Sequence, residues 1–176
     1  MMRRSGLLLA VLAAVLGVVL PAGTASADQL CAITWDSDMK SASPTTGSPM
    51  VDLTAGQHDC YDRLVFHVRT SANGYLVRYV DEMHEDVTGT PIPLRGDARL
   101  SITVHAPAYD SNFESTYTYE DRRELVDVSG FETFRQVAWG NSWEGTSTVG
   151  LGVRDHLPFR VLILPGRIVI DVAHDW

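Results

Sequence analysis

The clearest β-strand of the chain lies in the sequence GQHDCYDRLVFHVR, residues 56–69. From Asp62 onward the side chains alternate between two faces, one with Leu64, Phe66 and Val68 and the other with Val65, His67 and Arg69. A period of two residues is typical of a strand that is buried on one face. We therefore expect a central strand over residues 62–70, and a fold built around it.

Other short stretches have a similar character. They cover residues 51–55, 75–81, 100–106, 125–128, 133–139, 147–154, 159–164 and 167–173. Asn73-Gly74 predicts that the central strand and residues 75–81 form an antiparallel hairpin or lie close together. Residues 140–146 and Pro165-Gly166 are interpreted as turns. No stretch of ten or more residues has a helical period, so we expect an all-β fold. Eight or nine short strands predict an antiparallel β-sandwich or a partly closed barrel.

The first 27 residues have the pattern of a secretory signal peptide. Arg3 and Arg4 precede an apolar run over residues 7–20, and Ala25-Ser26-Ala27 provides small residues at a cleavage site. The run is too short to predict a membrane-spanning helix. We therefore expect a secreted protein that starts at Asp28 and has no membrane insertion after signal removal, by either the general or the twin-arginine export route.

The expected mature chain is strongly acidic. All 22 acidic residues lie beyond residue 27 and two of the 14 basic residues lie before it, so the mature net charge is 12 minus 22, or −10. This charge argues against nucleic acid and anionic membranes as partners. Cys31 and Cys60 are the only cysteines, and in an oxidising compartment they predict one structural disulfide. It would link an N-terminal tether, residues 28–49, to the start of the central strand.

Motifs for catalysis or metal binding are weak. Residues 140–145 resemble a nucleophile elbow, but the second glycine comes one residue late and a strand follows instead of a helix. None of the six histidines pairs with another at zinc-ligand spacing. Acidic residues are plentiful without a positional signal for a glycosidase pair. We expect no metal, no cofactor and no catalytic residue, and an unrecognised hydrolase is the least favoured alternative.

Two groups of residues are candidates for ligand binding. The first group precedes or begins the central strand and consists of His58, Asp59, Tyr61 and Arg63. A structural alternative is a corner in which Asp62 accepts backbone hydrogen bonds and pairs with an arginine. The second group is aromatic and could stack on sugar rings: Tyr117, Tyr119 and Trp143. Trp139 is expected in the core, and Trp143, which lies in an expected turn, is expected to be exposed. Residues 108–123 lack a clear period and are expected to form a long functional loop.

Residues 56–66 resemble the opening of the AMIN-like domain of exported actinobacterial proteins. The resemblance continues in residues 74–80, 92–94, 134–139, 157–161 and 168–173, and its most specific parts are residues 62–66 and 167–172. It covers about residues 50–176. Related AMIN domains are β-sandwiches attached to N-acetylmuramoyl-alanine amidases and pilus secretins, where they bind the cell wall and do not catalyse.

The resemblance implies a secreted, non-catalytic binding module associated with the cell wall. The ligand implied is peptidoglycan or another cell-wall glycan. The alternative is a domain that holds an envelope protein through an exposed sheet edge or through the 108–123 loop. In outline we expect a signal peptide over residues 1–27, the tether over residues 28–49 and the AMIN-like β-sandwich over residues 50–176.

Overall fold

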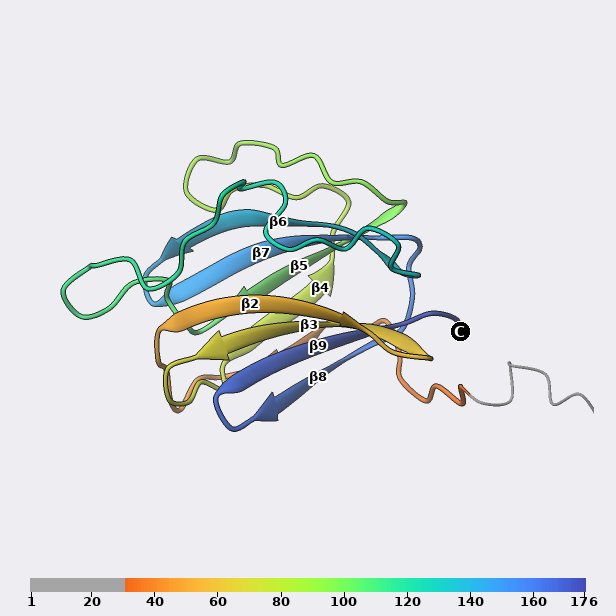
Figure 1. The fold of residues 1–176 in the computed structure, drawn as a ribbon, viewed down its shortest axis with the longest axis horizontal. Coiled ribbons are helices and arrows are strands. Elements are labelled where there is room, and N and C mark those ends of the chain that lie inside the picture. Colours follow the sequence, from red (N-terminus) through yellow and green to blue (C-terminus); the bar gives the residue numbers. More distant parts are fainter. Residues whose placement is uncertain (1–30) are drawn as a thin grey trace, which may run out of the picture.

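Every regular element in residues 31–176, the part of the chain that the computed structural model describes, is a β-strand (Figure 1). The strands are β1 (Lys40–Ala42), β2 (Met50–Gln57), β3 (Tyr61–Val68), β4 (Tyr75–Tyr79), β5 (Ala98–Val104), β6 (Phe134–Trp143), β7 (Thr146–Val153), β8 (Phe159–Leu164) and β9 (Arg167–Ala173). The expected signal peptide lies outside the described residues.

The strands form two antiparallel sheets that face each other. One sheet has the order β1-β4-β5-β7-β6 and the other has the order β2-β3-β9-β8 (Figure 1). The all-β prediction is confirmed, and of its two variants the observed one is the β-sandwich. The nine strands agree with the expected eight or nine.

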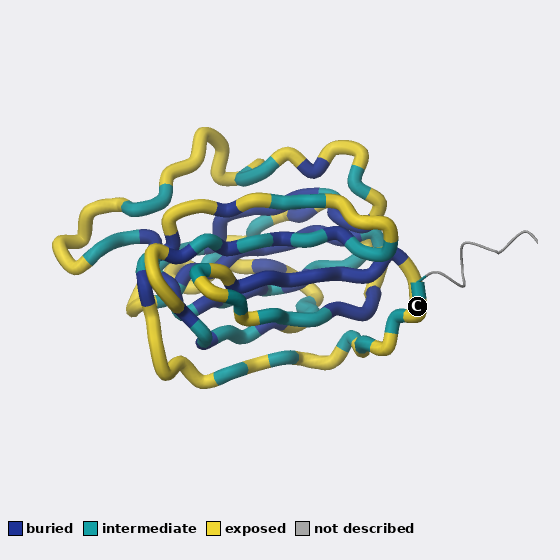
Figure 2. The backbone as a smooth tube through the Cα atoms, turned by 60° about the horizontal axis from the view of Figure 1, so that its bottom comes forward, coloured by how far each residue is buried: buried dark blue, intermediate teal, exposed yellow. Residues whose placement is uncertain are grey.

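The core lies between the sheets. On β3, Leu64 and Phe66 have no exposed surface and Val68 is 5% exposed, as the alternation predicted. On β5, Leu100 and Ile102 are likewise fully buried. Figure 2 shows the buried residues concentrated along the strands and the exposed ones along the loops. This burial is the main source of stability, because apolar surface removed from water contributes about 25 cal/mol per Å².

The predicted pairing of β3 with β4 is wrong, because these strands lie in different sheets. Asn73 does not close a hairpin; its side-chain oxygen accepts hydrogen bonds from the backbone of Thr45 and Thr46, at 3.0 and 3.2 Å. The expected N-terminal tether supplies the neighbour of β4 instead, since Lys40–Ala42 forms β1 and pairs with β4. Residues 70–74 therefore carry the chain from one sheet to the other.

Two further local predictions are corrected. Residues 125–128 form no strand; only the backbone N–H of Leu125 reaches β6, at the carbonyl of Val137. β6 does not end at residue 139 but continues to Trp143, and the turn is confined to Glu144-Gly145. A shift in register at Gly140 lets the strand pass through a polar stretch that has the composition of a turn.

The predicted disulfide between Cys31 and Cys60 is present. Asp62 accepts backbone hydrogen bonds as predicted, but its side-chain partner is His174 and not an arginine. Arg63 pairs instead with Asp171, 2.7 Å away. The reason is the strand alternation, which points Asp62 inward and Arg63 outward.

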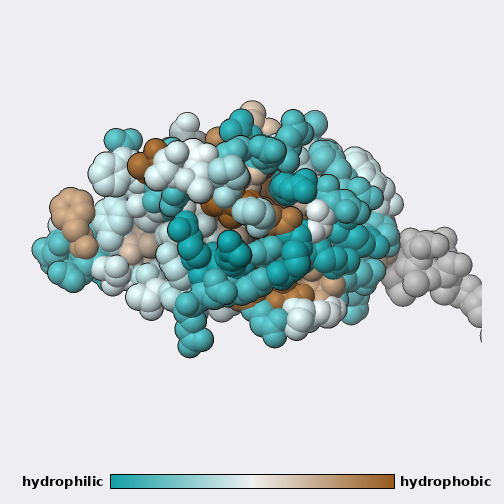
Figure 3. Space-filling model, turned by 90° about the horizontal axis from the view of Figure 1, so that it is seen from above, coloured by the Kyte–Doolittle hydropathy of each residue, from teal (hydrophilic) through white to brown (hydrophobic). Residues whose placement is uncertain are grey.

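A long loop, residues 80–97, packs on the outer face of β6 and β7. Gly152 allows this approach, because a Cβ atom at that position would lie 2.0 Å from the carbonyl oxygen of Arg95. Figure 3 views the loop-covered side, where hydrophilic side chains predominate and hydrophobic ones are visible in the hollows between them.

Candidate functional site

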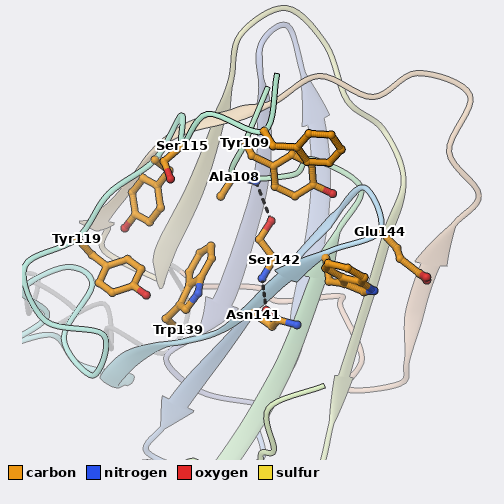
Figure 4. Close-up of a pocket in the computed structure, with 11 residues that line it drawn as sticks. Ala108, Tyr109, Ser115, Tyr119, Trp139, Asn141, Ser142 and Glu144 are labelled. Atoms are coloured by element: carbon orange, nitrogen blue, oxygen red, sulfur yellow. Dashed lines mark hydrogen bonds between the residues drawn. The ribbon is translucent and has the colours of Figure 1, made fainter. Parts of the chain in front are cut away.

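A pocket of about 540 Å³ opens at the end of the sandwich where the β6–β7 turn meets the loop after β5 (Figure 4). Most of its lining side chains are aromatic or small and polar. The lining consists of Ala108, Tyr109, Phe113, Ser115, Tyr117, Tyr119, Trp139, Asn141, Ser142, Trp143 and Glu144. Its size falls within the range typical of small-molecule sites, about 300–1,000 Å³.

Hydrogen bonds hold the loop against the hairpin. Ser142 Oγ accepts the backbone N–H of Ala108 at 2.8 Å and donates to the carbonyl of Thr146 at 2.9 Å. The backbone N–H of Gly145 donates to the hydroxyl of Tyr109 at 3.0 Å. Figure 4 shows the loop residues on one side and the β6 residues on the other. The pocket wall is therefore preformed on both sides.

The aromatic wall is graded from buried to exposed. Trp139 is only 8% exposed, and its ring centroid lies 5.7 Å from that of Tyr117 and 5.4 Å from that of Tyr119. Toward the rim, Trp143 is 62% exposed and Phe113 is 83% exposed. The expectations that Trp139 belongs to the core and that Trp143 is exposed are both confirmed. Large exposed aromatic groups beside a pocket are typical of a binding surface.

One polar side chain of the pocket lining, Asn141, has a hydrogen-bond donor without an acceptor in the described part of the chain. The side-chain oxygen of Asn141 accepts the backbone N–H of Ser142, while its buried Nδ2 has no hydrogen-bond partner among the described residues. A buried donor without an acceptor costs about 1–3 kcal/mol.

Charge in the pocket is low. Glu144, in the β6–β7 turn, is the only charged side chain of the lining. Burial raises the pKa of Tyr117 to about 12, with a further contribution from the carboxylate of Asp52. The Tyr117 hydroxyl therefore keeps its proton at neutral pH and is a neutral donor or acceptor for a ligand.

The first group of sequence candidates lies elsewhere, at the β2–β3 turn and on the outer face of β3. His58 stacks on Tyr61 with ring centroids 4.6 Å apart, and the guanidinium of Arg63 lies 5.2 Å from the Tyr61 ring. Asp59 is exposed in the same turn. These four residues are close together, but they are remote from the pocket, because Asp62 of β3 contacts the start of β6 and the pocket lies at its end.

An ion-pair network completes this second surface. The carboxylate of Asp171 is fully buried and accepts hydrogen bonds from Arg63 at 2.7 and 2.9 Å and from Arg160 at 2.8 Å. The Arg160 guanidinium also covers the ring of Trp35, 4.2 Å from its centroid. The network gives Arg63 an intramolecular role, and the pKa of Arg63 is raised by its hydrogen bond to Asp171.

Comparison with known families identifies the domain. Residues 48–174 match the AMIN-like domain. The chain belongs to the AMIN-like domain family. No curated protein and no solved structure matches the chain. Membership implies a non-catalytic binding module of the cell envelope. The AMIN-like domain and the disulfide together point to an extracytoplasmic location, because disulfides persist in oxidising compartments.

Sequence reasoning placed three residues of the AMIN-like domain's pocket among the candidates, Tyr117, Tyr119 and Trp143. It missed the polar pair Asn141 and Ser142, because residues 140–146 were interpreted as a turn. No sequence signal distinguished this pair, because the continuation of β6 past Gly140 depends on a register shift in its pairing with β7. The structure thus brings together the aromatic candidates and separates them from the group around Tyr61.

Within residues 31–176, no group of three or more histidine, cysteine, aspartate or glutamate side chains is placed to hold a metal ion. The same residues contain no helix long and apolar enough to cross a membrane.

Proposed function

We propose that this AMIN-like domain binds a cell-wall glycan, with peptidoglycan as the expected ligand, in the pocket between the β6–β7 turn and the loop after β5. The observation that carries the proposal is the aromatic wall, which runs from buried Trp139 to exposed Trp143. It gives the envelope-binding role of the family a specific location in this chain.

Glycan chemistry suits such a wall. A pyranose ring has apolar C–H faces that pack on aromatic rings, while its hydroxyl and acetamido groups need a few well-placed hydrogen-bond partners. Trp143 and Tyr119 offer exposed ring surface at the pocket, since they are 62% and 41% exposed. Glu144, in the β6–β7 turn, supplies an acceptor for hydroxyl groups.

The lining favours binding over hydrolysis. Glycosidases use two carboxyl groups on opposite sides of the scissile bond, whereas this lining contains one carboxylate, Glu144. An unrecognised hydrolase therefore stays the least supported alternative, and an envelope protein is the alternative partner.

Co-sedimentation with purified peptidoglycan sacculi tests the proposal. The protein is residues 28–176 with its disulfide intact, and the salt concentration is varied up to about 0.5 M, where exposed charge interactions are largely screened. Saturable binding that survives high salt is expected, because the pocket is mainly uncharged. An absence of saturable binding at any salt concentration would overturn the proposal and direct the search to protein partners.

Matched variants locate the binding surface. We expect Trp143→Ala to weaken binding at least about tenfold, or by about 1.4 kcal/mol, as for a large aromatic contact residue. Trp176→Ala is the control, because Trp176 is 75% exposed and lies outside the pocket lining. His58→Ala tests the other candidate surface. Equal binding by Trp143→Ala and Trp176→Ala would show that the pocket is not the site.

Export belongs to the same proposal. The pattern of residues 1–27 supports removal of a signal peptide after Ala27 and release of a secreted, wall-associated protein that starts at Asp28. The intact mass of the protein recovered from the culture medium and the wall fraction tests this. A mass that includes residues 1–27 would contradict it.

A further inference from the structure

The sheets of the described chain end in four edge strands, β1 and β6 in one sheet and β2 and β8 in the other. An edge strand presents unpaired backbone N–H and C=O groups, which can pair with another chain. Proteins usually protect such edges with short strands, bulges, charges or covering segments. The way in which each of the four edges is protected therefore indicates which edge can pair with another chain.

Three of the edges are protected. β1 is only three residues long. β2 has a register shift between Met50 and Asp52, and it carries a carboxylate there. β6 has two register shifts, and residues 122 and 125 cover its edge through backbone hydrogen bonds to Trp139 and Val137. Each protection matches one of the usual devices.

β8 has none of these devices along most of its length. Its six residues pair with β9 in continuous register from Phe159 to Leu164, without a bulge. In Figure 1, β8 forms the lower edge of its sheet. Its sequence, FRVLIL, has one charged residue, Arg160, whose guanidinium lies 2.8 Å from the Asp171 carboxylate of the same chain. Ile163 on this edge is 43% exposed.

The backbone pattern shows which groups are open. The N–H of Ala173 donates to the carbonyl of Pro158, which makes this a hydrogen-bonded pair of the β8–β9 ladder. Hydrogen-bonded and non-hydrogen-bonded pairs alternate in an antiparallel ladder. Val161 and Ile163 therefore point their N–H and C=O groups away from β9. The N–H of Phe159 also points away, but it donates to the carbonyl of Asp36.

We propose that β8 pairs antiparallel with β8 of a second copy of this chain, about a two-fold axis at Leu162. In that register Val161 of one copy lies opposite Ile163 of the other, so the open backbone groups of both residues are satisfied. Arg160 lies opposite Leu164, and no like charges face each other across the pair. The two four-stranded sheets join into one sheet of eight strands.

The second copy is the occupant that the edge chemistry favours. An edge with apolar side chains and an internally neutralised arginine complements itself, even though the chain as a whole is acidic. A charged peptide would find no opposite charge along the open residues of β8. The pairing leaves the pocket lining untouched, so it does not depend on the proposed glycan binding.

Sedimentation velocity over a concentration series of residues 28–176 tests the proposal. The expected result is a monomer–dimer equilibrium with twice the monomer mass at high concentration. Ile163→Pro removes one outward N–H but leaves the β8–β9 ladder intact, so we expect a folded protein with a dimer Kd raised at least about tenfold. Ile163→Lys places a charge on the edge, and we expect it to raise the dimer Kd by a similar factor.

Two controls accompany these variants. Val51→Lys changes an exposed residue of the opposite edge, and Trp143→Ala changes the pocket; both are expected to dimerise like the unmodified chain. Circular dichroism checks folding. If the unmodified chain is monomeric at all concentrations, the proposal is overturned, even if β8 of that chain binds another protein. Dimerisation of folded Ile163→Pro and Ile163→Lys with unchanged affinity would overturn it equally.

Discussion

Substitution of Asp62 is expected to destabilise the domain more than a typical point substitution, because this side chain joins the two sheets. Asp62 belongs to β3 and has no exposed surface. One carboxylate oxygen accepts the backbone N–H groups of Thr133 and Phe134, at 2.6 and 2.9 Å. The other lies 3.0 Å from Nε2 of His174, which is 5% exposed. Residues 133 and 134 lead into β6 of the opposite sheet.

The magnitude follows from these contacts. Asp62→Ala leaves two buried backbone donors without an acceptor, at about 1–3 kcal/mol each, and removes a charge-assisted hydrogen bond of about 1.5–3 kcal/mol. Thr133 and Phe134 are 0% and 1% exposed, so bulk water does not replace the carboxylate. We expect a loss of about 4–6 kcal/mol in the free energy of unfolding. Asp62→Asn keeps one acceptor oxygen and should lose about half of that.

Urea unfolding followed by tryptophan fluorescence and circular dichroism measures the effect. The midpoint should fall with an unchanged slope if the folded state keeps its compactness. Asp59→Ala is the control; this nearby carboxylate is exposed, and its change should stay within about 0.5 kcal/mol. A loss below about 1 kcal/mol for Asp62→Ala would refute the reasoning, because it would mean that the two backbone donors find another acceptor at little cost.

Three further predictions concern pH, the disulfide and a glycine. Burial raises the pKa of Tyr79 to about 12 in the folded state. The stability that its protonated hydroxyl contributes is therefore fully present below about pH 10, the pKa of tyrosine in the unfolded chain, and is lost as pH rises toward 12. Tyr79→Phe should flatten this alkaline decline in unfolding experiments. Replacing Cys31 and Cys60 by alanine opens a loop of 29 residues and should cost about 3–4 kcal/mol in denaturant titrations. Gly152→Ala should cost about 1–3 kcal/mol in melting experiments, whereas Gly56→Ala, with no atom within 4 Å of the added Cβ, should not destabilise by crowding.

Local periodicity predicted the strands and the core well, because alternation depends only on which residues face the interior. Leu64 and Phe66 are fully buried for this reason. Strand partners were harder to predict. The Asn73-Gly74 step has the composition of a hairpin turn, yet Asn73 bonds to residues 45 and 46, and only those distant contacts decide that the chain changes sheets.

The candidate site shows the same limit. Trp143 was predicted to be exposed because its segment was interpreted as a turn; it is exposed, although it is the last residue of β6. Asn141 could not be identified, because its place in the pocket wall depends on a register shift in β6 and on the packing of a loop more than twenty residues earlier in the chain. The separation of Tyr61 from Tyr117 likewise depends on the layout of the sandwich, which alternation alone does not specify.

The position of the disulfide determines how the domain can be presented on a surface. Cys31 is bonded to Cys60, and the backbone N–H of His174 donates to the carbonyl of Cys60 at 3.0 Å, so both ends of the described chain leave from the same place. β6 starts near this place and reaches the pocket after its ten residues, or roughly 30 Å. A domain coupled to a bead or a sensor chip through either terminus would therefore display its pocket outward, toward the solution.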